Sequence, residues 1–343
     1  MHNAISLLRL ATPVNTGLFC LLIVVACGTL SACRYAAIAP QTQGIGNFVT
    51  VDDGVRLYYT EKGQGSTVLV APAALYLEPH LLQQLAKNRR VIFYDPRNRG
   101  RSDRVELSRV SLEIQVKDLE SLRQTLGLER MALLGWSSYG LEMAVYAMRY
   151  PERVSRLIQL APLAPAASIR QQASRTQEQT NSDAAVAELE RRKAAGDFVG
   201  RPEDYCRRSN ALTDPAYFAD PGFIKQMPDV CELPNEWPQH LRPYFEAFYS
   251  GFGNYDWRPG LSRLNVPRLV IHGREDRLPI AGAEAWVAGY PNARLMVIPA
   301  SGHFPYIEQK AIVTAAIETF LTGDWPATAR IISVRHSAES DHQ

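Results

Sequence analysis

The sequence predicts an α/β fold in which helices cover both faces of a mostly parallel central sheet, with a helical cap insertion. Short apolar runs of strand type alternate with segments of helical periodicity, which is typical of parallel sheets whose strands are joined by helices. We expect strands at residues 48–51, 55–60, 67–71, 91–95, 131–135, 154–160, 268–272 and 294–298. The first two should form a hairpin, because Asp52-Asp53-Gly54 supplies the positive φ of a tight turn.

The alternation also predicts where the chain divides. Helices are expected at 111–126, where apolar residues recur at helical spacing, and at 140–150. Residues 165–262 break the rhythm, because they are polar and helical at first and then rich in proline, aromatic residues and turns. We therefore assign the core to 47–164 and 263–325, the cap insertion to 165–262, and a flexible polar tail to 326–343.

Composition excludes several classes of protein. The chain has 343 residues, of which 46% are hydrophobic and 21% charged, as in an ordinary globular enzyme. Its 37 basic residues nearly balance its 35 acidic ones, which argues against a dedicated nucleic-acid binder. The seven histidines form no i, i+4 pair and no His-Glu-x-x-His motif, so we expect no metal and no cofactor.

The N-terminal segment has the character of an export signal. Residues 17–32 are apolar and uncharged, too short for a membrane-spanning helix of roughly 20 residues. Leu30-Ser31-Ala32-Cys33 resembles the bacterial lipobox, which implies a signal peptide at 1–32, a lipid on Cys33 and a tether at 33–46. Arg34 then favours the outer membrane, facing the periplasm. An uncleaved anchor, ordinary secretory cleavage nearby, and the looser match ending at Cys27 are the alternatives.

Two cysteines remain in the predicted folded part. Cys206 and Cys231 are 25 residues apart and would be a candidate disulfide in an oxidising compartment. Two buried thiols are the alternative. Neither cysteine belongs to a Cys-x-x-Cys or Cys/His pattern, so zinc is not expected.

A candidate nucleophile lies between a predicted strand and a predicted helix. Gly135-Trp136-Ser137-Ser138-Tyr139-Gly140 places Ser137 where a sharp strand-to-helix turn would expose its hydroxyl above the sheet. The helix N-terminus there offers unpaired amides and a positive dipole end. Small residues are expected two positions to either side of such a serine, yet Tyr139 follows it. Taking Ser138 as the nucleophile would instead put Trp136 at the tight preceding position.

The order of residues along the chain predicts the catalytic partners of this serine. Asp276 follows the strand expected at 268–272, and His303 follows the strand expected at 294–298. Serine, acid and histidine thus occur in the order of a nucleophile-elbow hydrolase, each beyond the carboxyl end of a strand, where parallel sheets open their crevice. We predict Ser137 as nucleophile, His303 as general base and Asp276 as the residue that orients the histidine.

The sequence resembles the α/β-hydrolase family from about Gly46 to Trp325. The segment 95–102 (DPRNRGRS) is similar to the family's D-x-R-G-x-G-x-S turn, with Asn98 in place of a glycine because asparagine tolerates positive φ. Arg258-Pro259 and the segment 302–305 (GHFP) are similar to the proline-iminopeptidase-like branch. The resemblance implies that the locally basic run 97–104 is a structural turn and that no nucleic acid is bound.

The resemblance also implies an oxyanion hole made of backbone amides. The family's His-Gly motif is replaced by Ala71-Pro72-Ala73-Ala74, but amides act whatever side chain they carry. Ala73 and Ser138 are therefore the expected donors, with Ala74 as the alternative to Ala73. Trp136 and Tyr139 flank the nucleophile and are expected either to wall the acyl pocket or to pack in the core.

These observations predict a serine hydrolase, of carboxylester hydrolase or aminopeptidase type, that cleaves an ester or amide of a small-to-medium acyl substrate through an acyl-enzyme. Its partner would be a small molecule or short peptide, and no oligomeric state is indicated. A proline iminopeptidase is the alternative, although the HGGPG and GGSWGS patterns are missing. Cap glutamates that could receive an N-terminal ammonium are Glu203, Glu232, Glu236 and Glu246. A non-catalytic binding protein of the same fold is the third possibility.

Overall fold

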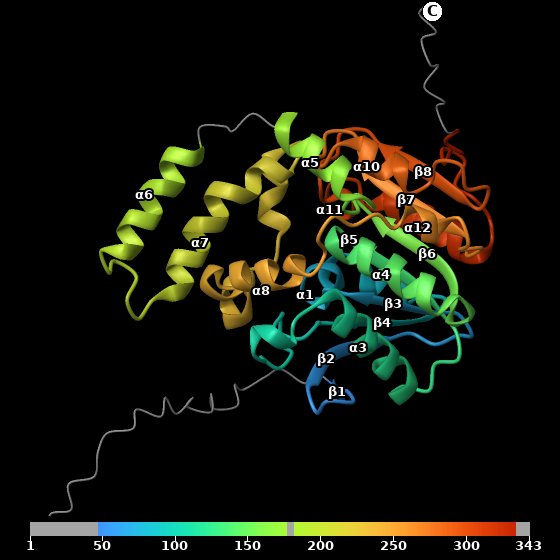
Figure 1. Ribbon diagram of the computed structural model, residues 1–343, viewed down its shortest axis with the longest axis horizontal. Helices are drawn as coiled ribbons and strands as arrows, with labels where there is room; N and C mark the ends of the chain where they lie inside the picture. The colour runs from blue at the N-terminus through green and yellow to red at the C-terminus, as the bar shows by residue number, and fades with distance from the viewer. Residues whose placement is uncertain (1–46, 177–181, 334–343) are drawn as a thin grey trace, which may run out of the picture. The chain divides into compact units, whose positions relative to one another are not determined.

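The computed structural model of the protein describes residues 47–176 and 182–333 (Figure 1). One eight-stranded sheet forms its centre, in the order β1-β2-β4-β3-β5-β6-β7-β8, antiparallel only where β2 meets β1 and β4. The strands are β1 (Asn47–Thr50), β2 (Arg56–Lys62), β3 (Val68–Pro72), β4 (Arg90–Tyr94), β5 (Met131–Trp136), β6 (Val154–Leu160), β7 (Arg268–Gly273) and β8 (Ala293–Ile298). The predicted fold class is confirmed. The predicted signal peptide, lipidated Cys33 and tether lie outside the described residues.

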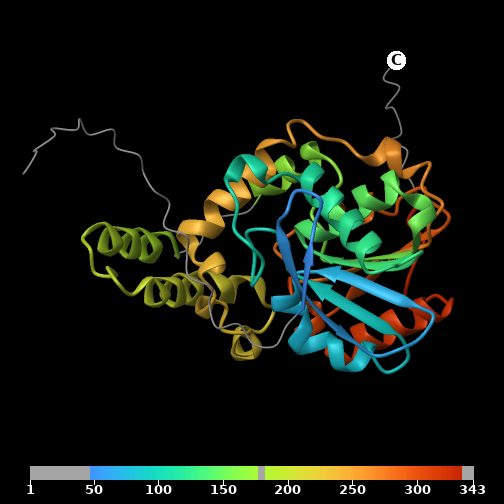
Figure 2. The same ribbon diagram turned by 90° about the horizontal axis from the view of Figure 1, so that it is seen from below.

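Helices cover both faces of the sheet because its strands are buried on both sides (Figure 2). In β4, Val91 and Phe93 pack on one face while Ile92 and Tyr94 pack on the other. The first face is covered by α1 (Ala74–Leu77), a π-helical turn η1 (Glu78–Leu82), α2 (Gln83–Leu85), α11 (Pro305–Glu308) and α12 (Lys310–Thr322). The opposite face is covered by α3 (Leu112–Thr125), α4 (Ser138–Arg149) and α10 (Ile280–Ala285).

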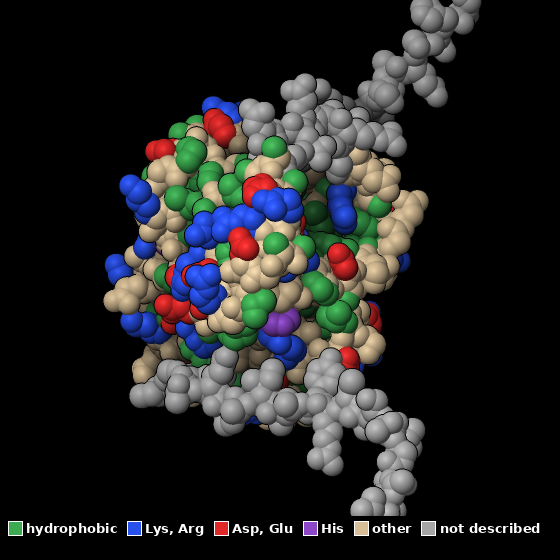
Figure 3. All heavy atoms as spheres, turned by 90° about the vertical axis from the view of Figure 1, so that its left-hand side faces the viewer, with side chains coloured by type: hydrophobic (Ala, Val, Ile, Leu, Met, Phe, Trp, Pro, Cys, Tyr) green, Lys and Arg blue, Asp and Glu red, His purple; other side chains and the backbone are tan. Residues whose placement is uncertain are grey.

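The predicted cap, residues 165–262, enters the chain between β6 and β7 (Figure 1). Its helices are α5 (Ala167–Thr176), α6 (Ser182–Ala194), α7 (Pro202–Thr213), α8 (Pro238–Ser250) and α9 (Arg258–Leu261), with 3₁₀ turns η4 (Asp214–Tyr217), η5 (Pro221–Gln226), η6 (Val230–Glu232) and η7 (Pro234–Glu236). Further 3₁₀ turns, η2 (Leu107–Arg109) and η3 (Pro151–Arg153), lie in the core. Figure 3 shows basic and acidic side chains side by side on the cap face. Ion pairs within the cap include Arg191–Glu188 and Arg192–Asp197.

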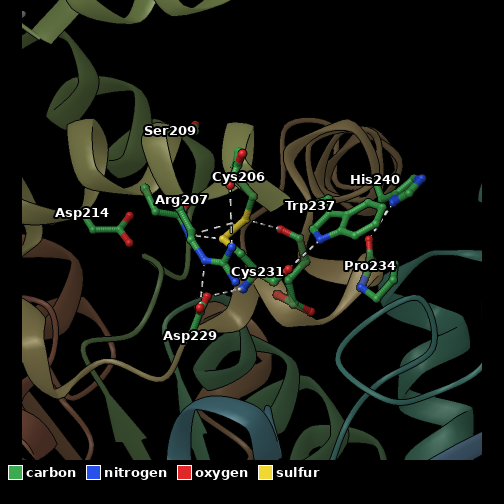
Figure 4. Close-up of a disulfide and its surroundings, with 12 residues drawn as sticks. Cys206, Arg207, Ser209, Asp214, Asp229, Cys231, Pro234, Trp237 and His240 are labelled. Carbon is green, nitrogen blue, oxygen red and sulfur yellow. Dashed lines mark hydrogen bonds and ion pairs between the residues drawn. A yellow bond between two sulfur atoms is a disulfide. The ribbon is translucent and has the colours of Figure 1, made fainter. Parts of the chain in front are cut away.

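A disulfide joins two parts of the cap. Cys206 of α7 is bonded to Cys231 of η6, and the indole N–H of Trp237 donates to the Cys231 carbonyl at 2.8 Å (Figure 4). Arg207, next in α7, pairs with Asp229 in the loop before Cys231. Of the two alternatives left by the sequence, the structure therefore has the bonded one. The link fixes the loop around Cys231 to helix α7.

The predicted flexible tail, 326–343, needs a correction over its first residues. Arg330 exchanges backbone hydrogen bonds with Leu295 of β8, and the amide of Gly289 donates to the carbonyl of Ile332. The cause is that β8 is an edge strand, whose outer backbone groups accept a further partner. Residues 334–343 lie outside the described part. Among the described helices, none combines the length and apolar character that a membrane span requires.

Removing the disulfide should weaken the protein. Replacing both Cys206 and Cys231 by serine opens a loop with a sequence separation of 25, for which loop-closure entropy predicts a loss of about 3.5 kcal/mol in the free energy of unfolding. Urea unfolding of the double variant, followed by tryptophan fluorescence, checks this value. The unreduced protein and the same protein in dithiothreitol provide the control. Equal unfolding midpoints in all three samples would contradict the prediction.

Candidate active site

The turn at Ser137 is strained in the way that a nucleophile elbow requires. Ser137 follows β5 and precedes α4, with φ 57° and ψ −125°, a conformation that is rare outside glycine. Added at Gly135, a Cβ atom would lie 2.6 Å from the Tyr139 carbonyl carbon. At Gly140 it would lie 2.9 Å from the Pro162 Cβ. The close approaches thus fall on positions 135 and 140, which explains why Tyr139 is tolerated after the serine.

Three predicted side chains meet at this turn in a row of hydrogen bonds. The Nε2 atom of His303 lies 3.0 Å from the Ser137 hydroxyl oxygen. The Nδ1 atom of His303 lies 2.9 Å and 3.1 Å from the two carboxylate oxygens of Asp276. A proton on Nδ1 satisfies the carboxylate and leaves Nε2 free to accept from the hydroxyl. Ser137, and not the alternative Ser138, is the serine that contacts the histidine.

Asp276 is held as an anion behind the histidine. Burial raises the pKa of this carboxyl, but the electrostatic interaction and hydrogen bond with His303, the neighbouring His272 and the Leu278 amide together lower it below its usual value. Burial lowers the pKa of His272, whose Nε2 lies 2.9 Å from the Leu278 carbonyl oxygen. An anionic Asp276 is what a histidine that must take up a proton requires.

The loop that carries His303 is fastened to its surroundings. The Trp136 indole donates to the His303 carbonyl at 2.9 Å, and the His303 amide donates to the carbonyl of Tyr217 in the cap at 2.7 Å. Glu308 accepts from the amides of Gly302 and Ala219, at 2.6 Å and 2.8 Å. The imidazole therefore has a fixed position that depends on the cap.

The two residues expected to supply oxyanion amides both lie at helix starts. Ser138 is the first residue of α4, and Ala73 (φ 65°) is the N-cap of α1. Amides in a first helical turn have no intrahelical acceptor. The preceding strands, β3 and β5, are neighbours in the sheet, so both starts lie at the same edge. The amide of Leu75, by contrast, already donates to Asp95 at 3.2 Å, which leaves Ala73 or Ala74 for this position.

A cavity of about 610 Å³ opens above the serine and is lined by core and cap together. Both expected wall residues, Trp136 and Tyr139, line it with Ser137 and His303. Most of the remaining wall is apolar or aromatic, including Tyr217, Ile224, Met227, Val230, Leu241, Phe245, Tyr249 and Phe304. The sequence did not assign several polar lining residues to this wall, among them Tyr76, Arg99, Asn210, Asp214 and the ion pair of Arg207 with Asp229.

Only one of the four candidate glutamates lines the cavity. Glu236 is fully buried and pairs with Arg99 through two hydrogen bonds of 2.8 Å and 3.0 Å. Glu203 is partly exposed, whereas Glu232 and Glu246 are exposed, and none of these three reaches the cavity wall. The glutamate that does reach the cavity is therefore already neutralised by an arginine.

Asp214 is the carboxylate in the wall that no described cation pairs with. It accepts a hydrogen bond of 3.2 Å from the neighbouring Thr213 hydroxyl. Burial raises the pKa of Asp214 to about 6. The carboxylate is therefore charged at neutral pH and loses its charge in mildly acidic solution.

The basic run 97–104 is largely used inside the protein. Arg97 is buried and pairs with Asp118 and Asp53, and Arg99 pairs with Glu236. Asn98 adopts the positive φ expected of it, 62°, and its amide bonds to Val105 in both directions. Within the described ranges, no cluster of three or more His, Cys, Asp or Glu side chains could hold a metal ion.

A serine at a strained strand-to-helix turn, an aspartate after β7 and a histidine after β8 are features of the class of α/β proteins with a nucleophile elbow. The family model described as alpha/beta hydrolase fold matches residues 71–310, so the chain belongs to this family. Membership places the chain in the α/β-hydrolase superfamily, and its curated relatives are enzymes.

Individual relatives have different activities. A non-heme haloperoxidase from Rhodococcus erythropolis is 28% identical over 269 residues, which cover 75% of this chain and 92% of the relative. A proline iminopeptidase from Lactobacillus delbrueckii subsp. bulgaricus is 28% identical over 251 residues, covering 67% and 80%. An esterase from Exiguobacterium antarcticum superposes with a TM-score of 0.62 at 22% identity, covering 81% of this chain and all of the esterase. That likeness shows the shared fold.

Proposed function

We propose that the protein is a serine hydrolase that cleaves carboxylic esters, and more slowly amides, of small-to-medium acyl groups. The observation that carries the proposal is the row of hydrogen bonds from Ser137 through His303 to Asp276, with distances of 3.0 Å and 2.9 Å, at one side of a cavity of about 610 Å³. A non-catalytic binding protein would not need this row. The cavity volume lies in the range of small-molecule sites.

In the proposed mechanism, the Ser137 oxygen attacks the acyl carbon while His303 Nε2 takes the hydroxyl proton. The amides of Ser138 and Ala73 hold the oxyanion that forms. As the bond to the leaving group breaks, His303 returns the proton to the departing alcohol. A water molecule, deprotonated by His303, then attacks the acyl carbon. The bond to Ser137 breaks as His303 returns this proton to the Ser137 oxygen, and the acid leaves; Asp276 keeps the imidazole oriented throughout.

Labelling with a fluorophosphonate probe tests the proposal. The wild type should be labelled and should hydrolyse p-nitrophenyl butyrate, because an activated serine attacks phosphorus and acyl carbon alike. Ser137→Ala should lose labelling and fall by about 10⁶-fold in kcat, as when a nucleophile is removed from a triad. Ser138→Ala, which keeps its backbone amide, is the matched control and should still be labelled. A folded wild type that reacts with neither reagent would end the enzyme hypothesis.

The residues that line the cavity favour an esterase over a proline iminopeptidase. Glu236 is occupied by Arg99, so it offers no free charge to an N-terminal ammonium. The remaining wall is mainly aromatic and aliphatic, which suits an apolar acyl chain. The iminopeptidase alternative rests on the likeness to that relative and on Asp214, whose unpaired carboxylate could accept a cationic group.

The carboxylate of Asp214 should give the enzyme a measurable preference for substrates with a cationic acyl chain. The measured quantity is the kcat/KM of p-nitrophenyl 6-aminohexanoate divided by that of the isosteric p-nitrophenyl heptanoate. Above pH 6, where Asp214 is ionised, this ratio should be about tenfold higher for the wild type than for Asp214→Asn. The preference should vanish as the pH falls through about 6, because the carboxyl becomes neutral. The ratio of the two esters cancels the titration of the catalytic base. A ratio that is independent of pH and of the substitution would contradict this role.

We also propose that the protein is exported to the bacterial cell envelope and anchored by a lipid on Cys33. The argument rests on the sequence 30–33 (LSAC), and it is supported by the Cys206–Cys231 disulfide, since such bonds persist in oxidising compartments. Metabolic labelling with radioactive palmitate should mark the protein in a bacterial host. Cys33→Ser should abolish the label, whereas Cys27→Ser should not. Equal labelling of both variants would refute the assignment of Cys33.

A further inference from the structure

The two segments that carry the proposed oxyanion amides are joined by one buried ion pair. We propose that Arg99 and Glu236, together with the hydroxyls of Tyr76 and Tyr139, form a strut that sets the spacing of these amides. The inference rests on the proposed function, because it concerns the oxyanion hole of that reaction. In this account Tyr76 and Tyr139 are positioning residues, and the cap residue Glu236 completes the catalytic geometry.

Tyr139 links the strut to the nucleophile helix. It directly follows Ser138 in the first turn of α4, and its buried hydroxyl accepts a hydrogen bond of 2.6 Å from Arg99 Nη1. The helical backbone fixes the direction in which the side chain leaves. Holding the phenol therefore holds the first turn of the helix and, with it, the Ser138 amide.

Tyr76 makes the equivalent link to the other segment. It lies in the first turn of α1, where its amide donates to the Ala73 carbonyl at 3.0 Å. Its hydroxyl donates to Glu236 Oε2 at 3.3 Å. Burial and the neighbouring Glu236 charge both raise the pKa of Tyr76, so the phenol remains a neutral donor. The start of α1, with Ala73 and Ala74, is thus tied to Glu236.

In the ion pair between the two tyrosines, every guanidinium nitrogen of Arg99 and both carboxylate oxygens of Glu236 have hydrogen-bond partners. Glu236 Oε1 accepts from Arg99 Nε at 3.0 Å and from the Gly100 amide at 2.7 Å, and Oε2 accepts from Arg99 Nη2 at 2.8 Å. The side chains of Glu236 and Arg99 are 0% and 6% exposed. The rings of Tyr244 and Phe245 lie 5.2 Å from the guanidinium. A buried pair with all these partners is rigid, since moving either ion would leave the other uncompensated.

The base of the strut belongs to the core. Arg99 lies in the turn after β4, where Asp95 accepts from the amides of Leu75 and Arg101 at 3.2 Å and 3.1 Å. Asn235, beside Glu236, donates to the carbonyls of Gly100 and Ser102 at 3.1 Å and 2.9 Å. The cap turn η7 is therefore seated on the same core turn that carries Arg99. Docking of the cap on the core therefore also sets the spacing of the two amides.

Removal of single hydroxyls tests the strut. Tyr139→Phe and Tyr76→Phe keep the ring and remove the hydroxyl that bonds to the Arg99–Glu236 pair. Each should lower kcat for p-nitrophenyl butyrate by about tenfold, a fraction of the 100- to 1000-fold that loss of a whole oxyanion donor costs. KM should stay within about twofold, because the effect belongs to the transition state. The double variant should lose little more than either single variant, since both break the same link.

A transition-state analogue separates positioning from general loosening. The Ki of a butyryl trifluoromethyl ketone, which forms an oxyanion on Ser137, should rise by the same factor by which kcat/KM falls. Tyr205→Phe is the matched control, because this buried cap tyrosine donates to Glu190 within the cap at 2.5 Å and does not line the cavity. It should leave kcat and Ki unchanged. Thermal melting of all variants checks that each is folded at the assay temperature.

Other results would overturn the strut. A raised KM at unchanged kcat would make the tyrosines contacts of the substrate. A lower kcat without a matching rise in Ki would exclude the oxyanion hole as the affected part, and losses that multiply in the double variant would exclude a shared link. Failure of the wild type to hydrolyse esters would instead refute the proposed function, so the two failures are distinguishable.

Discussion

The strained backbone at Ser137 is the constraint on which the site depends. The chain leaves β5 and enters α4 through one residue of positive φ. The Ser137 amide donates to Leu160 at the end of β6, and its carbonyl accepts from Leu163 at the start of the cap connection. Strain of about 1–3 kcal/mol persists only where the surroundings overdetermine the conformation. Here the neighbouring strand, the absence of a side chain at Gly135 and the packing of Gly140 on Pro162 provide that restraint.

The sheet order brings the other groups to this turn. Strands β5, β6, β7 and β8 are consecutive neighbours and parallel, so their carboxyl ends share one edge. Asp276 follows β7 and His303 follows β8, which places both within reach of a serine that follows β5. The cap closes this edge from above and holds the His303 loop through Tyr217 and Ala219. Serine, base and cavity are thus products of one topological arrangement.

Local patterns predicted the strands and the candidate site because each has a local physical cause. The apolar runs and their alternation with helical segments predicted the ends of each strand to within one or two residues. The bounds of β6, 154–160, were predicted without error. Asn98 was recognised because positive φ favours few residue types. The row Ser137, His303 and Asp276 followed from motif and chain order, and the structure brings these side chains within hydrogen-bonding distance.

The polar residues that line the cavity could not be predicted from local sequence patterns. Arg99 and Glu236 are 137 residues apart, and no period or spacing connects an arginine in a core turn with a glutamate in the cap. Asp214 looks like any residue of a surface turn until the fold faces it towards the cavity. The tail was expected to be free because its composition is polar, but the edge of β8 pairs with Arg330 through backbone groups that composition does not describe.

A crystal structure of the protein after reaction with a butyl fluorophosphonate would locate the nucleophile and the oxyanion donors together, because the adduct imitates the tetrahedral intermediate. We expect phosphorus bonded to Ser137 Oγ, His303 Nε2 beside the leaving-group position, and the phosphoryl oxygen within about 3 Å of the amides of Ser138 and of Ala73 or Ala74. Phosphorus on another residue, or a phosphoryl oxygen turned away from both amides, would contradict the proposed mechanism.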